Sequence, residues 1–274
     1  LTENPILETD VMDAGGHKVA YLMYNGFTAN FDQQLNDAFR SFVAEGATEL
    51  VLDLRYNGGG SVQTATYLAS MITGQFNGQL FAKQQWNSKV EAALDQARLI
   101  NNFTNNIDGR AINSMNLSRV FILTASGTAS ASELVINGLK PYINVVQIGD
   151  VTTGKNVGSI TLYDSPSFSR TDRKMTHKYA MQPLVFKTIN KDGFGEYQNG
   201  LEPNFILRED PGNLSQLGNP AEPLLSTALG LISNNARMIK QNSDNVAKDF
   251  KDSKSMRRFG TDMYVEIPGG LKSF

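Results

Sequence analysis

The sequence predicts a layered α/β fold, because short apolar strands alternate with amphipathic helices along much of the chain. An alternating strand is expected at 18–24, and a helix with its apolar residues on one face at 31–45. A second strand, 50–54, leads through three consecutive glycines into a helical pattern that ends near Ile72. Strands joined in this way by helices are typical of a sheet covered by helices.

The next strand and helix enclose a serine. The apolar run 120–123 predicts a buried strand, and a short loop of small polar residues then leads to a helix at 131–139, which Ser130 or a neighbour caps. Backbone N–H groups at a helix start stabilise developing negative charge, so a serine at this point is a candidate nucleophile. A further apolar run, 145–148, ends in a glycine-flanked loop that carries Lys155.

Two motifs in this order resemble those of the carboxyl-terminal processing (tail-specific) serine peptidases. The first is VLDLRYNGGG at 51–60, which is similar to the family's DLRxNxGG. The second is SASE at Ser130, followed 25 residues later by the lysine of a GK pair, Lys155. The resemblance extends over roughly 18–230. It implies a ClpP/crotonase-like α/β spiral core, with Ser130 as the nucleophile and Lys155 as the general base.

The same resemblance implies an oxyanion site on the glycine turn. Its donors in this chain are the N–H groups of Gly59 or Gly60 and of Ala131, the residue after the nucleophile. Glycines lack a Cβ, so consecutive N–H groups can point at one oxygen. A plain strand-to-helix turn is the alternative interpretation of the glycines alone.

A lysine can act as a base only when it is neutral, and its ordinary pKa is about 10.4. Burial of the Lys155 loop is therefore expected, and an exposed loop lysine is the alternative. We expect a neutral oxygen rather than a carboxylate to hold the amine. Ser159 is the first candidate, at the position where many family members have a glutamine. Pro141 stands where some members have an acidic residue, and Glu133 is expected to cap the helix backbone.

Other chemistries fit the sequence less well. The stretch GDVTTGK at 149–155 matches a phosphate-binding pattern, but Asn156 replaces the required Ser or Thr and a β-branched run replaces the helix, which argues against nucleotide binding. The chain has two histidines and no cysteine, so we expect no thiol nucleophile, no metal and no cofactor. A net charge of −2 shows no bias toward binding polyanions, so we expect no nucleic-acid partner.

The expected organisation is a catalytic core at 1–232 and a polar extension at 233–274. A polar, asparagine-rich insertion near 74–118, with a helix at 89–100, is a candidate lid or substrate rim. The extension is expected to hold a short strand within 259–265, as a solvated arm or as a clamp on a partner subunit, which leaves a homo-oligomer open. No segment is long enough for the PDZ domain that many relatives carry.

The resemblance implies a serine endopeptidase that cleaves proteins or peptides near apolar C-terminal tails through an acyl-enzyme. It also implies an exported, periplasmic or cell-envelope location, although no signal peptide opens the chain and no apolar stretch approaches eighteen residues. Two alternatives remain. One is a catalytically silent ligand- or peptide-binding homologue, and the other is a crotonase-like acyl-CoA enzyme.

Overall fold

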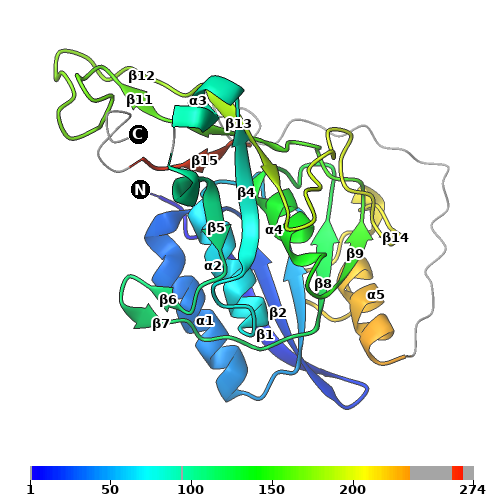
Figure 1. Ribbon diagram of the computed structural model, residues 1–274. Helices are drawn as coiled ribbons and strands as arrows, with labels where there is room; N and C mark the ends of the chain where they lie inside the picture. Colours follow the sequence, from blue (N-terminus) through cyan, green and yellow to red (C-terminus); the bar gives the residue numbers. More distant parts are fainter. Residues whose placement is uncertain (1, 94, 235–260, 268–274) are drawn as a thin grey trace.

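The computed structural model describes residues 2–93, 95–234 and 261–267, which form a layered α/β structure (Figure 1). One layer is a six-stranded sheet in the order β1-β2-β3-β8-β9-β14, and another is a five-stranded sheet in the order β15-β10-β13-β4-β5. The strands of the six-stranded sheet are β1 (Ile6–Ala14), β2 (His17–Tyr24), β3 (Glu49–Asp53), β8 (Arg119–Thr124), β9 (Asn144–Gly149) and β14 (Phe205–Ile206). Those of the five-stranded sheet are β15 (Met263–Val265), β10 (Val157–Ile160), β13 (Leu184–Ile189), β4 (Leu80–Trp86) and β5 (Ile100–Asn102).

The six-stranded sheet is parallel except at β1, which pairs antiparallel with β2. Parallel neighbours need crossover connections, and helices lie in those from β2 to β3, from β3 to β8 and from β8 to β9. The four main helices are α1 (Asp32–Ala44), α2 (Val62–Thr73), α4 (Ala131–Leu139) and α5 (Pro223–Ile232). The predicted layered α/β class is thereby confirmed. No helix within the described ranges is long and apolar enough to cross a membrane.

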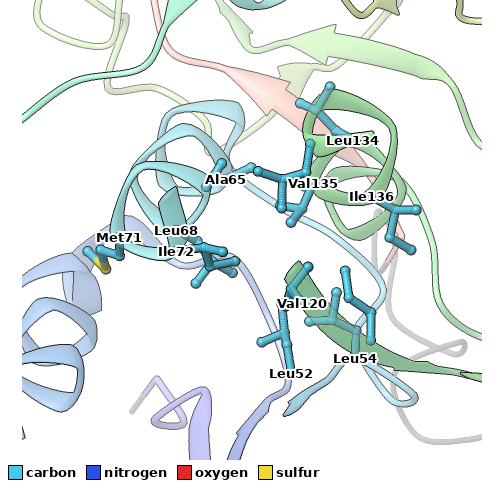
Figure 2. Close-up of a cluster of buried hydrophobic side chains, with 14 of the residues drawn as sticks. Leu52, Leu54, Ala65, Leu68, Met71, Ile72, Val120, Leu134, Val135 and Ile136 are labelled. Carbon is cyan, nitrogen blue, oxygen red and sulfur yellow. The ribbon is translucent and has the colours of Figure 1, made fainter. Parts of the chain in front are cut away.

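Strand residues alternate between two hydrophobic cores. Leu52 and Leu54 point toward α2 and α4, where Val120 of β8 joins them, as Figure 2 shows. Val51 faces the opposite side and packs in the core that includes Leu225 of α5. A sheet buried on both faces holds the ends of its strands rigidly. The loops that follow β3 and β8 therefore start from fixed positions.

The segment near 74–118 belongs to the body of the molecule. It supplies β4 and β5, and Phe81 and Phe103 lie in the larger core with at most 2% of their surface exposed. The expected helix at 89–100 is also shorter than predicted. It divides into α3 (Ser88–Ala93), a 3₁₀ turn (Gln96–Leu99) capped by Asp95, and β5. Its aromatic residues are thus core residues, and a role of the segment as a lid or substrate rim stays a prediction.

Two short hairpins complete the described structure. One consists of β6 (Asn106–Ile107) and β7 (Arg110–Ala111), and the other of β11 (Leu162–Tyr163) and β12 (Ala180–Met181). The β11–β12 hairpin begins shortly after β10 and extends away from both sheets in Figure 1.

The buried Arg55 connects the end of β3 to the start of α5. The Arg55 guanidinium contacts the carboxylates of Asp53, Glu209 and Glu222, each at 2.9 Å. Glu222 also caps α5 by accepting a hydrogen bond from the Leu225 N–H at 2.9 Å. The Asp53–Arg55 pair is thus part of a network that fixes the strand end from which the glycine turn starts.

Candidate active site

Ser130 lies at the start of α4 in a strained backbone conformation. Its φ is 64° and its ψ is −112°, a region that side-chain-bearing residues rarely adopt. The residue is fully buried, and its Oγ has no hydrogen-bond partner within the described part of the chain. A buried hydroxyl without a partner costs about 1–3 kcal/mol, so its persistence points to a role in chemistry.

Glu133 joins the serine to the lysine loop. Its Oε2 accepts hydrogen bonds from the backbone N–H groups of Ser130 and Lys155, both at 2.8 Å. Its Oε1 accepts from the Gly154 N–H at 2.7 Å and from the Thr152 hydroxyl at 2.5 Å. The predicted helix capping is confirmed, and the same carboxylate also fixes the backbone of the candidate base.

The glycine turn packs directly on the start of α4. A Cβ built on Gly59 would lie 2.7 Å from the Ser130 Cβ and 3.0 Å from the Ala131 nitrogen. The structure therefore brings Gly59, Ser130 and Ala131 together. The Gly59 N–H, however, donates to the Asn57 Oδ1 at 2.9 Å. This bond favours Gly60 over Gly59 as the glycine donor to an oxyanion.

Asn57 holds the turn against both neighbours, a role that the sequence analysis missed. Its side-chain Nδ2 donates to the Tyr24 carbonyl at 2.8 Å, and its backbone carbonyl accepts from the Ser132 hydroxyl at 3.0 Å. The same carbonyl accepts from the Ala129 N–H at 3.1 Å. The asparagine of the DLRxNxGG pattern was the available signal, because a buried amide side chain can satisfy backbone groups on two elements at once.

We expect Gly59→Ala to lower kcat/KM by roughly 100-fold or more, the size of effect seen when an oxyanion site is disturbed. Its methyl group would meet Ser130, and its φ of 110° is already unfavourable for alanine. Gly109→Ala is the matched control, because Gly109 has a φ of 86° and open space around its Cβ position. If both variants retain parental kcat/KM, the turn has no part in catalysis.

The amine of Lys155 pairs with the carboxylate of Asp262, just before β15. The two side chains are 18% and 12% exposed. Burial lowers the pKa of the Lys155 amine, while the carboxylate beside it favours the charged form. The Ser159 hydroxyl instead donates to the Met263 carbonyl at 3.1 Å and accepts from the Gln182 amide at 3.0 Å. The partner of the lysine therefore differs from the neutral oxygen that we expected.

The remaining sequence predictions for this region concern the loop and the histidines. The stretch 149–155 is followed by the strand β10 and not by a helix, as predicted. His17 is exposed at the start of β2, and His177 pairs with Asp164 at 3.2 Å on the β11–β12 hairpin. Among the residues that the structure describes, no group of three or more histidine or acidic side chains could hold a metal ion.

Comparison with known proteins connects this geometry to a family. The model of Peptidase family S41 matches residues 18–205. The "Probable CtpA-like serine protease" of Staphylococcus aureus (strain MRSA252) is 26% identical over 257 residues, covering 89% of this chain and 47% of its own length. The carboxyl-terminal-processing protease of Picosynechococcus sp. is 23% identical over 229 residues, covering 84% and 48%. The chain thus spans about half the length of these curated relatives.

Solved structures agree with the sequence comparison. An S41 family protein of Bacteroides fragilis NCTC 9343 superimposes with a TM-score of 0.73 at 31% identity, covering 86% of this chain and 60% of that one. The photosystem II D1 C-terminal processing protease has the same fold, with a TM-score of 0.57 at 22% identity over 87% of this chain and 55% of its own. The expected ClpP/crotonase-like α/β core is confirmed. Since the family model covers more than half of its residues, the chain belongs to peptidase family S41.

Proposed function

We propose that this protein is a serine endopeptidase that cleaves proteins or peptides near apolar C-terminal tails. Ser130 is the nucleophile and Lys155 is the general base. The observation that carries the proposal is the position of Ser130: a buried, unpaired hydroxyl at a strained helix start, tied through Glu133 to the Lys155 loop. The names of relatives, which include carboxyl-terminal-processing proteases, support the choice of substrate.

The chemistry proceeds in two steps. Ser130 Oγ attacks the scissile carbonyl carbon while neutral Lys155 takes the hydroxyl proton, and the C–N bond breaks as Lys155 passes that proton to the leaving amine. Water then attacks the acyl-enzyme ester, with Lys155 again accepting and returning a proton. The N–H groups of Ala131 and Gly60 stabilise the oxyanion in both steps, with Gly59 shaping the turn.

Two alternatives from other classes make different predictions. A silent ligand- or peptide-binding homologue binds an unstructured protein with an apolar C-terminus but leaves it intact. A crotonase-like acyl-CoA enzyme turns over thioesters in preference to peptides. Incubating the parent and Ser130→Ala with such a protein, and following its mass, separates the peptidase from both alternatives, and turnover of an acyl-CoA thioester separates those two from each other. Shortening of the protein by the parent alone supports the peptidase, and an intact protein contradicts it.

Activity should rise with pH. The active form of Lys155 is neutral, so kcat/KM is highest above the pKa of Lys155 and decreases as the pH falls through that pKa. Because burial lowers this pKa, the rise should be centred below the ordinary lysine value of about 10.4. A profile of kcat/KM between pH 5 and 10 checks the prediction. A flat profile removes Lys155 from the role of base.

An exported, periplasmic or cell-envelope location is part of the same proposal, and it is supported by the resemblance to carboxyl-terminal processing proteases. The proposal is compatible with a monomer and with a homo-oligomer. Fractionation of cells that produce the full-length protein tests the location, and recovery in the cytoplasmic fraction contradicts it.

A further inference from the structure

The segment 261–267 connects the two parts of the candidate site. Its strand β15 runs parallel to β10, pairing Met263 with Gly158 directly downstream of the lysine loop. On its other side, the Tyr264 N–H donates to the carbonyl of Gly60 at 3.0 Å. In Figure 1, β15 is the red strand at the edge of the five-stranded sheet. One short segment thus contacts both the strand after the base and the glycine turn.

Packing fixes the position of Asp262 at the start of this segment. The next side chain, Met263, is fully buried in the larger core, and its carbonyl accepts the hydrogen bond from Ser159. With its neighbour anchored, the Asp262 carboxylate is held against the Lys155 amine, where both side chains are more than four-fifths buried. An ion pair in such surroundings is much less screened than one at the surface.

While the ion pair is formed, Lys155 cannot take the proton of the Ser130 hydroxyl. A protonated amine cannot accept the serine proton, and the Ser130 hydroxyl makes no hydrogen bond to Lys155 or to any other residue described. We propose that Asp262 is a positioning residue that holds Lys155 in its charged, resting form, and that catalysis requires this pair to open. The inference rests on the proposed peptidase function.

Other titratable groups around the lysine loop are engaged elsewhere. Glu133 of α4 accepts four hydrogen bonds from the loop backbone, Thr152 and Ser130. Lys187 of β13 pairs with Glu196, and the Tyr197 hydroxyl contacts the Thr188 hydroxyl at 3.2 Å. On β15 and its continuation, Tyr264 and Glu266 form no hydrogen bond or ion pair with Lys155 in the described part of the chain, and burial raises the pKa of Tyr264. Asp262 is the carboxylate that the structure pairs with the amine.

The test is Asp262→Asn, which keeps the size of the side chain and removes its charge. The pKa of Lys155 is measured from the ¹⁵Nζ resonance of labelled protein, assigned by its loss in Lys155→Arg. Removing an opposite charge that contacts the amine should lower that pKa by about one unit or more. The rise of kcat/KM with pH should move to lower pH by the same amount, giving roughly tenfold more activity on the acidic limb. Asp262→Glu should restore the parental profile.

Glu266→Gln is the matched control, because Glu266 is an exposed carboxylate only four residues further along. It should leave the pKa of Lys155 and the kcat/KM profile unchanged. An unchanged Lys155 pKa in Asp262→Asn overturns the inference, whether or not the protein cleaves peptides. A lowered pKa with an unmoved kcat/KM profile overturns it as well. A lowered pKa in a protein without Ser130-dependent cleavage supports the electrostatic hold and contradicts the proposed function instead.

Discussion

Replacing Ser130 with alanine is expected to lower kcat/KM by roughly 10⁴- to 10⁶-fold, the scale on which loss of a serine nucleophile acts. The reason lies in the site: no other hydroxyl has this combination of helix start, burial and missing partner among the residues that the structure describes. Hydrolysis of an unstructured protein with an apolar C-terminus, followed by mass spectrometry, provides the measurement. Ser215→Ala, at an exposed serine, is the control and should match the parent.

Lys155→Ala should lower kcat/KM to about the same residual value as Ser130→Ala. The double variant should be no less active than either single variant. Substitutions of residues that act as one unit have strongly non-additive effects, because the first substitution already abolishes the function that the two residues share. Lys178→Ala, at an exposed lysine, controls for loss of positive charge. Losses that multiply in the double variant, or parental activity in Ser130→Ala, would contradict the dyad.

The central part of the fold could be predicted from the sequence because its elements carry strong local signals. The helix expected at 131–139 has these bounds in α4, and the strand expected at 50–54 lies within one residue of β3. The strand is a short, mostly apolar segment that leads into the glycine turn, and the helix begins where a loop of small polar residues ends at the capping Ser130. Turn and cap residues of this kind lie next to the apolar residues in the sequence, so the bounds of both elements can be predicted locally.

Edge and peripheral elements gave weaker signals. β1 carries mostly exposed side chains and pairs only with β2 in the six-stranded sheet, so its polar composition concealed a nine-residue strand. The helix α5 was also missed, although Glu222 followed by Pro223 is a helix-start signal. Its apolar face is required by the second core, which becomes apparent only once the sheet is assembled.

The candidate site shows the same division between local and distant information. Ser130, Gly59 and Lys155 stand in motifs whose spacing the sequence displays directly. Asp262 lies far along the chain in a polar stretch, and its contact with Lys155 depends on the pairing of β15 with β10. A residue that reaches Lys155 only through tertiary structure has no nearby sequence motif that would reveal it. The expectation that Ser159 holds the amine therefore rested only on its position in the sequence.

Glu133 is expected to be the residue on which the alignment of the whole site depends. Both of its oxygens accept hydrogen bonds, and three of its four donors are backbone N–H groups that cannot rotate away. Glu133→Gln places an amide NH₂ where an oxygen was. If the NH₂ replaces Oε2, it faces the N–H groups of Ser130 and Lys155. If it replaces Oε1, it faces the Gly154 N–H. In either orientation at least one buried donor is left without an acceptor.

We therefore expect Glu133→Gln to lower the free energy of unfolding by about 1–3 kcal/mol, the cost of an unsatisfied buried group. We also expect kcat/KM to fall by roughly 100-fold, because a displacement of about 1 Å between reacting groups has that effect. Urea unfolding and steady-state kinetics measure the two changes. Glu202→Gln, at an exposed carboxylate, should leave both unchanged.

Ile232→Val distinguishes lost alignment from lost stability. It removes one buried methyl group from α5, on the opposite side of the sheet, and should cost about 0.5–1.5 kcal/mol without moving the site. If its kcat/KM equals that of the parent while that of Glu133→Gln falls, the carboxylate acts by holding Ser130 and Lys155 in register. Equal activity in Glu133→Gln and the parent would show that the two backbones keep their relative position without it.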